Sequence, residues 1–236
     1  MVHPVAQIVV DALQKAGAKR VYGIPGDTID TLMESIRKED DVEFVVCRHE
    51  SNAGFMASGH ARVTGRLGVA VACQGPGTNN LINGIADAAG DRVPVLAITG
   101  QVDSSRIGSG MPQESSQLQL LEDLCLFNVE ARSPENLMEM LHIAINTALT
   151  RRGLVHISVP SDVMLGRPVK QSPPVFVTGS DSQLIPSAAS LEAAAAAIAT
   201  AKHPAILYGE GARCCSDLVV ALSEKLQAPL IHTTRS

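Results

Sequence analysis

Short apolar runs alternate with longer segments of helical pattern along most of the chain. We expect strands at residues 20–26, 42–47, 67–77, 93–101, 127–133 and 154–160. These runs are continuously apolar rather than strictly alternating, which is typical of strands buried on both faces. Helical patterns lie between them, at residues 4–16, 28–39, 51–65, 79–90 and 133–152. The order predicts an α/β fold, a doubly wound parallel sheet with helices on both faces.

Hydroxyl side chains mark three of the predicted helix starts. Thr28 and Ser51 are expected N-caps, and Ser133 is expected to cap a helix with Pro134 at its first position. Residues 102–127 are irregular and contain a stretch rich in Gly and Ser. A long surface loop of this kind is more often functional than decorative.

A change of composition divides the chain into two predicted domains. Residues 1–165 hold the six predicted strands, and residues 166–186 contain four prolines without a helical period, as a linker does. A second domain is expected over residues 187–236. Its predicted elements are helix 190–201, strand 204–211, helix 215–227 and strand 228–234. Two βα units are too few for a domain of this class, so we expect it to be truncated.

Composition and charge limit the type of core, the binding partners and the cellular compartment that we expect for this chain. Apolar residues make up 45% and aromatic residues 3%, so the core must be built from Ala, Val, Leu and Ile. The net charge of −5 offers no basic surface for nucleic acid. No signal peptide or membrane-spanning run is visible. The five cysteines form neither a disulfide framework nor a metal-ligand pattern, which favours a reducing cytoplasm.

Four strand ends are expected to meet at one edge of the sheet, where open parallel sheets bind ligands. They lie at residues 23–27, 48–50, 74–78 and 99–102. Glu50 and Asp27 are the acidic residues in this set. The helix after Glu50 is crowded with small residues, and a helix of this kind permits close backbone approach. It packs either onto the chain's own sheet or at a subunit interface.

Two glycine-containing turns have more than one interpretation. The segment GPGTNN at 75–80 is either a phosphate loop or an ordinary strand-to-helix turn, and it has no P-loop lysine. The segment YGEGAR at 208–213 is a G-x-G turn after a strand without the third glycine of a dinucleotide fingerprint. The residues alone therefore give a fold and a carboxylate at a glycine-rich edge, and leave the reaction open.

Five motifs in order give the chain a specific resemblance. They are GIPGDTID, RHE, ASGHARVTGRLG, GPGTNNLINGIADA and DRVPVLAITGQV. Together they resemble the pyrimidine-binding domain of thiamine-diphosphate enzymes, in the branch of pyruvate oxidase and acetolactate synthase. The resemblance covers residues 4–165 and continues into the start of the central domain.

The resemblance implies a role for Glu50. In this family a glutamate at that position hydrogen-bonds N1′ of the cofactor's aminopyrimidine, so that the 4′-nitrogen can take the proton of the thiazolium C2. The thiazolium then serves as the electron sink for decarboxylation of a 2-oxo acid such as pyruvate. A single carboxylate at the sheet edge is what this chemistry requires.

The resemblance assigns further residues to the site. Gln113 matches a loop glutamine near the reacting carbons, and Glu50 and Gln113 are the expected catalytic residues. The cofactor-binding positions implied in the first domain are Pro25, Gly26, Gly75, Pro76 and Asn80. The central domain of this branch commonly binds FAD, and the matching positions are Gly209, Gly211, Ala212 and Arg213.

One part of the family pattern is missing from the sequence. The Gly-Asp-Gly signature of the diphosphate domain does not occur, and Asn79 and Asn80 belong to the pyrimidine loop, so they do not replace the paired asparagines that complete a magnesium site in the family. We therefore expect no metal ligands in this chain, a magnesium site on a separate domain, and no activity of the chain alone. The resemblance also implies a homodimer or tetramer, with membrane association only if it is encoded beyond Ser236.

The reaction type stays open within the family. The segments PGD at 25–27, SSRIGSG at 104–110 and QE at 113–114 are most similar to pyruvate oxidases, including the quinone-reducing pyruvate dehydrogenase type. Pro112 replaces an aromatic residue of many relatives, and Asp27 replaces a glycine of many acetolactate synthases. The alternatives are an acetolactate synthase-type carboligase, a non-catalytic module of the same fold, and a nucleotide-binding domain.

Overall fold

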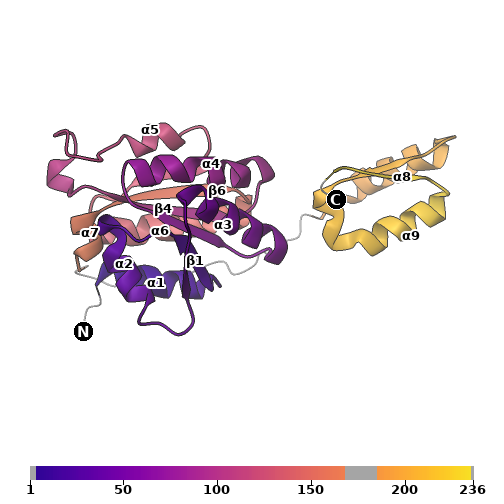
Figure 1. The fold of residues 1–236 in the computed structure, drawn as a ribbon. Helices are drawn as coiled ribbons and strands as arrows, with labels where there is room; N and C mark the ends of the chain where they lie inside the picture. Colours follow the sequence, from indigo (N-terminus) through magenta and orange to yellow (C-terminus); the bar gives the residue numbers. More distant parts are fainter. Residues whose placement is uncertain (1–3, 168–184, 235–236) are drawn as a thin grey trace. The chain divides into compact units, whose positions relative to one another are not determined.

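The computed structural model describes residues 4–167 and 185–234. These residues form two compact units, one within residues 1–181 and the other within residues 182–236. Figure 1 shows the fold of each unit. Most of the predicted linker, 166–186, lies outside the described residues. The two units are described one at a time below.

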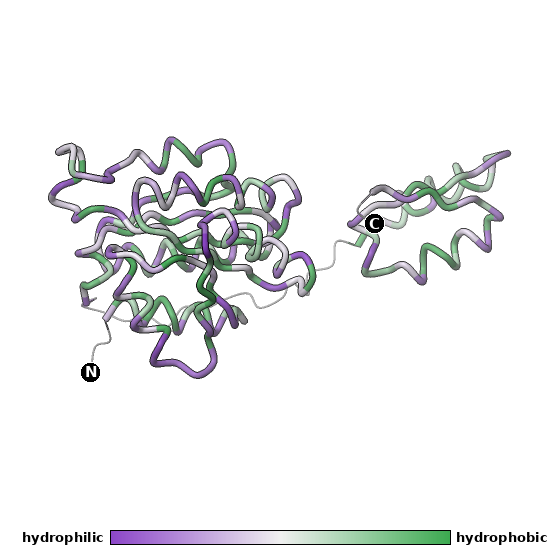
Figure 2. The backbone as a smooth tube through the Cα atoms, viewed as in Figure 1, coloured by the Kyte–Doolittle hydropathy of each residue, from purple (hydrophilic) through white to green (hydrophobic). Residues whose placement is uncertain are grey.

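The first unit is built on a six-stranded parallel sheet in the order β2-β1-β3-β4-β6-β5. Its strands are β1 (Arg20–Gly23), β2 (Glu43–Val46), β3 (Gly68–Ala72), β4 (Val95–Gln101), β5 (Phe127–Glu130) and β6 (Leu154–Pro160). The strands β3, β4 and β6 are buried along their whole length. This burial explains their continuous apolar sequences, and Figure 2 shows hydrophobic segments running through the interior of this unit.

Helices cover both faces of the sheet, as predicted. They are α1 (Val5–Lys15), α2 (Asp30–Ile36), α3 (Glu50–Thr64), α4 (Pro76–Asp91), α5 (Gln117–Leu121), α6 (Pro134–Arg151) and α7 (Ser161–Leu165). One apolar cluster joins the sheet to α1, α2, α6 and α7, and a second joins it to α3, α4 and α5. The doubly wound α/β fold is therefore confirmed.

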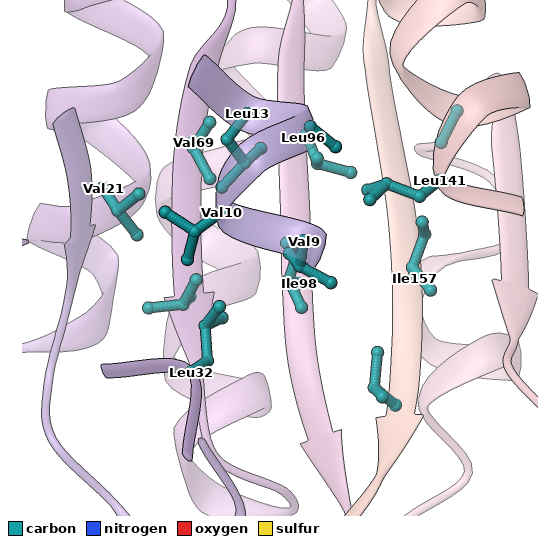
Figure 3. Close-up of a cluster of buried hydrophobic side chains, with 14 of the residues drawn as sticks. Val9, Val10, Leu13, Val21, Leu32, Val69, Leu96, Ile98, Leu141 and Ile157 are labelled. Atoms are coloured by element: carbon teal, nitrogen blue, oxygen red, sulfur yellow. The ribbon is translucent and has the colours of Figure 1, made fainter. Parts of the chain in front are cut away.

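The first cluster is aliphatic, as the scarcity of aromatic residues requires. Val9 and Leu13 of α1 lie over the central strands, close to Leu96 and Ile98 of β4 (Figure 3). Each fully buried side chain of this size contributes about 1.5–3 kcal/mol to folding. This cluster packs helices onto one face of the sheet. It does not involve the residues that directly follow the carboxyl ends of β1, β2 and β3.

Two of the predicted N-caps are wrong. Thr28 lies in a 3-10 turn, Asp27–Ile29, and the α-helix that follows begins at Asp30. The Thr28 hydroxyl is used elsewhere, because it donates to Gln74 Oε1 at 2.6 Å. Helix α3 begins at Glu50 rather than after Ser51, and its N-cap is His49, whose ring nitrogen accepts from the Ser51 amide.

The other two helix starts follow local chemistry. Ser133 caps α6 as predicted, since its hydroxyl accepts from the Asn136 amide at 3.2 Å. Helix α4 begins at Pro76, three residues earlier than predicted, with Gly75 at its N-cap. Proline suits the first helical position because its missing N–H would have no partner there.

The small residues of α3 have a specific packing role. A Cβ on Gly54 would lie 2.6 Å from the backbone carbon of Gly84 in α4, and a Cβ on Gly84 would lie 2.1 Å from the Ser51 carbonyl oxygen. A Cβ on Gly68 of β3 would lie 2.2 Å from the Ala57 carbonyl oxygen. Helix α3 therefore packs closely on its own sheet and on α4, and the second of these contacts was not predicted.

A polar cluster ties the same two helices together near their far ends. Arg62 of α3 forms ion pairs with Asp87 and Asp91 of α4, and the Ser58 hydroxyl donates to Asp87 Oδ2 at 2.5 Å. Small residues set the spacing of the two helices, and these contacts fix their register.

A histidine is buried in the centre of the sheet. His156 of β6 is fully inaccessible, and its Nδ1 lies 2.7 Å from Asn128 Oδ1 while its Nε2 lies 2.8 Å from Thr99 Oγ1. Burial lowers the pKa of His156 to about 3. The ring is therefore neutral in the folded chain at neutral pH.

The second unit pairs two short parallel strands with two helices. Its elements are α8 (Ala188–Thr200), β7 (Ile206–Tyr208), α9 (Ser216–Leu226) and β8 (Leu230–His232). Several of its apolar side chains are exposed, including Leu207 at 70% and Leu218 at 71%. The described residues of this unit thus do not enclose a core. Among all helices in the described ranges, none is both long and apolar enough to cross a bilayer.

The close contact of α3 and α4 predicts opposite effects for two similar substitutions. We expect Gly54→Ala to lower the free energy of unfolding by about 1–3 kcal/mol, because the new Cβ overlaps the α4 backbone. Gly59→Ala is the matched control, since a Cβ there meets nothing within 4 Å. It should be neutral or stabilising by up to about 1 kcal/mol. Urea unfolding followed by circular dichroism measures both, and equal effects would contradict the contact.

The buried histidine predicts a loss of stability in mild acid. Its folded pKa lies below the unfolded value of about 6.5, so the unfolded chain binds more protons between those values and stability falls as pH falls. Relative to His156→Gln, the wild-type chain should lose about 2 kcal/mol between pH 7 and pH 5. Urea unfolding at both pH values measures this, and a constant difference would show that His156 does not titrate.

Candidate active site

The carboxyl ends of β1, β2, β3 and β4 lie at one edge of the sheet, because the four neighbouring strands are parallel. Pro25 and Gly26 follow β1, Glu50 follows β2, and Gly75 and Pro76 follow β3. The structure thus places these sequence-predicted residues at a common edge. Asn80 joins them from the first turns of α4.

Glu50 is held by a residue from the neighbouring helix. Its Oε2 accepts a hydrogen bond from Asn80 Nδ2 at 3.0 Å, and among the described residues Asn80 is the only side chain seen to donate to it. The carboxylate is half-buried in the first turn of α3. It also lies beside the start of α4, where unpaired backbone N–H groups favour negative charge.

Gly77 leaves open space next to this carboxylate. A Cβ at Gly77 would lie 3.5 Å from Glu50 Oε1 and 3.5 Å from Cys73 Sγ. A Cβ there would be in ordinary van der Waals contact with the oxygen that Asn80 does not use. The sequence predicted Gly77 to lie at this edge, within residues 74–78, but gave it no role in the site.

Gly26 and Gly75 are needed by contacts within the chain. A Cβ on Gly26 would lie 2.2 Å from Cys73 Sγ, and a Cβ on Gly75 would lie 2.2 Å from the Gln113 carbonyl oxygen. Gly75 also has a φ of +57°, which favours glycine. The absence of a Cβ at these two positions therefore lets Cys73 and the backbone of Gln113 approach the edge.

The predicted loop glutamine is tied to the same edge through two other side chains. Gln74 Nε2 donates to Gln113 Oε1 at 3.3 Å, while Gln74 Oε1 accepts from the buried Thr28 hydroxyl. Gln113 itself is exposed. The chain Thr28–Gln74–Gln113 was not predicted, because it joins residues from three separate segments.

Cys73 lies at the base of the site and is not an activated thiol. Burial raises its pKa, and the neighbouring Asp27 and Glu50 carboxylates raise it further. The side chain therefore stays protonated at neutral pH and contributes a small neutral surface beneath Gly26 and beside Gly77. Nucleophilic chemistry at this residue is disfavoured, since the thiolate is the reactive form.

The four residues proposed for FAD lie together in the second unit. Gly209 follows β7 and caps a 3-10 helix, Glu210–Cys215, in which the Ala212 amide donates to the Gly209 carbonyl at 2.9 Å. A Cβ on Gly211 would meet nothing within 4 Å, and Arg213 pairs with Glu210 at 3.5 Å. Arg213 is therefore paired within the turn itself.

The described residues contain no group of three or more His, Cys, Asp or Glu that could hold a metal ion.

An edge of this kind, with one supported carboxylate among glycines, is typical of a cofactor-binding α/β domain. A family model, "Thiamine pyrophosphate enzyme, N-terminal TPP binding domain", matches residues 3–120. The chain therefore belongs to the thiamine pyrophosphate enzyme family. The resemblance inferred from its motifs is confirmed, and a nucleotide-binding domain is disfavoured.

Curated relatives extend the similarity over nearly the whole chain. The "Putative thiamine pyrophosphate-containing protein YdaP" of Bacillus subtilis is 37% identical over 99% of this chain. The "Acetolactate synthase isozyme 1 large subunit" of Escherichia coli is 34% identical over 97%, and the "Probable 2-ketoarginine decarboxylase AruI" of Pseudomonas aeruginosa is 35% identical over 95%. The chain spans 41%, 41% and 40% of their respective lengths.

The residues at the edge fit the aminopyrimidine of this cofactor. The space that a Cβ at Gly77 would fill lies against Glu50 Oε1, an oxygen for which the described residues provide no hydrogen-bond donor. A ring nitrogen bearing a proton would supply the missing donor. Asn80 meanwhile fixes the other oxygen, so the carboxylate has one open position.

Proposed function

We propose that this chain binds the aminopyrimidine of thiamine diphosphate at the Glu50 edge, as part of an enzyme that decarboxylates a 2-oxo acid. The observation that carries the proposal is the arrangement of Glu50, Asn80 and Gly77 in a domain of the thiamine pyrophosphate family. The bound cofactor supplies the carbanion-stabilising chemistry.

The residues of the chain have distinct tasks in this proposal. Glu50 would accept a hydrogen bond from the protonated ring nitrogen at Oε1, and Asn80 orients the carboxylate through Oε2. Gly77 admits the ring to contact distance, while Cys73 keeps the base of the site neutral. Gln113 is the polar group that the loop presents toward the substrate. Pre-organised groups of this kind are the main protein contribution to such chemistry.

Two reaction types are supported equally. Motifs in the loop are most similar to pyruvate oxidases, whereas the names of the relatives include acetolactate synthases and a 2-ketoarginine decarboxylase. Decarboxylation of a 2-oxo acid such as pyruvate is common to both proposals. They differ in whether the product is oxidised or joined to a second 2-oxo acid.

The proposal includes groups that come from outside this domain. This chain spans 41%, 41% and 40% of the lengths of the three relatives, so each relative is more than twice as long. The additional length is sufficient for a domain that binds diphosphate and magnesium. FAD is proposed to bind at Gly209, Gly211, Ala212 and Arg213. The exposed apolar side chains of the second unit would then be covered by the rest of a whole protein. The chain alone should show no magnesium-dependent turnover of pyruvate.

Replacing the carboxylate tests the site directly. We expect Glu50→Gln to abolish the shifts that a high concentration of thiamine causes in the NMR signals of the Gly77 and Asn80 amides, because a side-chain amide cannot take the ring proton as a carboxylate does. Glu122→Gln is the matched control, since it removes an equal charge from an exposed glutamate after α5. Unaltered binding by Glu50→Gln would overturn the proposal.

The exposed face of α3 predicts self-association. Phe55, Met56 and Val63 are 46%, 46% and 78% exposed on this helix, and an apolar patch of this kind marks an interaction surface. We expect a dimer or tetramer whose dissociation constant rises at least tenfold in Phe55→Lys. Sedimentation equilibrium measures this change. A wild-type chain that stays monomeric at high concentration would contradict it.

A further inference from the structure

We propose that Glu114 is the positioning residue that holds Gln113 at the candidate active site. This role rests on the proposed function in one respect, namely that Gln113 faces the substrate. The contacts of Glu114 are observed in the structure and do not depend on that proposal. Glu114 does not reach the Glu50 edge in any contact of the described residues. It would act through its neighbour in the loop.

Glu114 gathers three backbone N–H groups onto one carboxylate. Its Oε1 accepts from the Gly108 amide, and its Oε2 accepts from the amides of Gly110 and Met111 at 3.0 and 3.1 Å. The Glu114 amide in turn donates to the Met111 carbonyl at 3.0 Å. Residues 108–114 are thus closed into a ring around this side chain.

The geometry of the glycines is matched to this task. Gly108 and Gly110 have φ values of +86° and +73°, which other residues rarely adopt. These turns place their N–H groups on the Glu114 carboxylate. The hydrogen bonds, led by that of Gly108, lower the pKa of Glu114. The carboxylate is ionised at neutral pH, and charged acceptors form the stronger hydrogen bonds.

Gln113 needs such support because its own backbone is strained. Its φ is +66°, a left-handed conformation that costs a residue with a Cβ about 1–2 kcal/mol. In this conformation its carbonyl lies against Gly75 and its side chain reaches Gln74. The next residue along the chain is Glu114, so the ring of hydrogen bonds fixes the peptide that Gln113 shares with it.

Packing alone does not fix this loop, because residues 104–110 are all exposed. The loop lines an open pocket of about 600 Å³ together with Gln101 and Glu130. Among the described residues, the buried Ser115 hydroxyl has no hydrogen-bond partner. With so little of the loop buried, local hydrogen bonds decide its conformation.

The other end of the loop provides a matched control. Asp162 accepts from the Ser104 amide at 2.9 Å and from the Ser104 hydroxyl at 2.6 Å. Asp162 is thus a second carboxylate that anchors the loop, but at the end away from Gln113 in sequence. Its loss should loosen Ser104 without releasing the ring at residues 108–114.

The test compares Glu114→Gln with Asp162→Asn by NMR of the 236-residue chain. Glutamine offers one acceptor oxygen instead of two, so we expect the amides of Gly108, Gly110 and Met111 to exchange at least tenfold faster. The Gln74 side-chain amide signal should also move toward its position in unfolded peptide, because it reports the contact with Gln113. Asp162→Asn should leave these signals within twofold of the wild-type rates.

Two results would overturn the positioning role. One is wild-type exchange in Glu114→Gln, and the other is faster exchange with an unmoved Gln74 signal, which would make Glu114 a loop stabiliser only. Thiamine, which carries the aminopyrimidine without the diphosphate, is then titrated into the same samples at high concentration. Unmoved Gly77 and Asn80 signals in the wild-type chain count against the proposed function, while the loop signals still decide the role of Glu114.

Discussion

The close approach of α3 and α4 is the constraint on which the candidate site depends. Glu50 opens one of these helices and Asn80 lies in the first turns of the other, so the distance between the helix backbones sets the hydrogen bond between them. Gly54 and Gly84 allow that distance, and Arg62 fixes the register near the far ends. The carboxylate is therefore oriented by helix packing as much as by its own hydrogen bond.

The sheet contributes the second part of the arrangement. Parallel strands bring the residues after β1, β2 and β3 to one edge, but each segment must then turn without blocking its neighbour. Glycines at 26, 75 and 77 solve this problem in different ways, since two of them admit chain atoms and the third leaves space beside Glu50. Because the chain belongs to the thiamine pyrophosphate enzyme family, we propose that this space receives the aminopyrimidine ring of the cofactor.

Sequence patterns predicted the regular elements well and the contacts between segments poorly. The strand at 154–160 and the cap at Ser133 were correct because burial and local capping decide them. Thr28 was assigned to a helix cap, yet its hydroxyl bonds Gln74, which is 46 residues away. A side chain with a distant partner gives no local signal. Glu50 was named from its place at the sheet edge and Asn80 through family resemblance, whereas the contact between them came only from the structure.

The aliphatic core has a practical consequence for spectroscopy. The chain has no tryptophan and two tyrosines, of which Tyr22 lies in the first unit and Tyr208 in the second. Tyr22 is buried and bonded to His60, whereas Tyr208 lies beside His232. Each unit thus carries one tyrosine chromophore in its own environment. Absorption or dichroism from a bound flavin or thiazolium would stand out against an almost transparent protein.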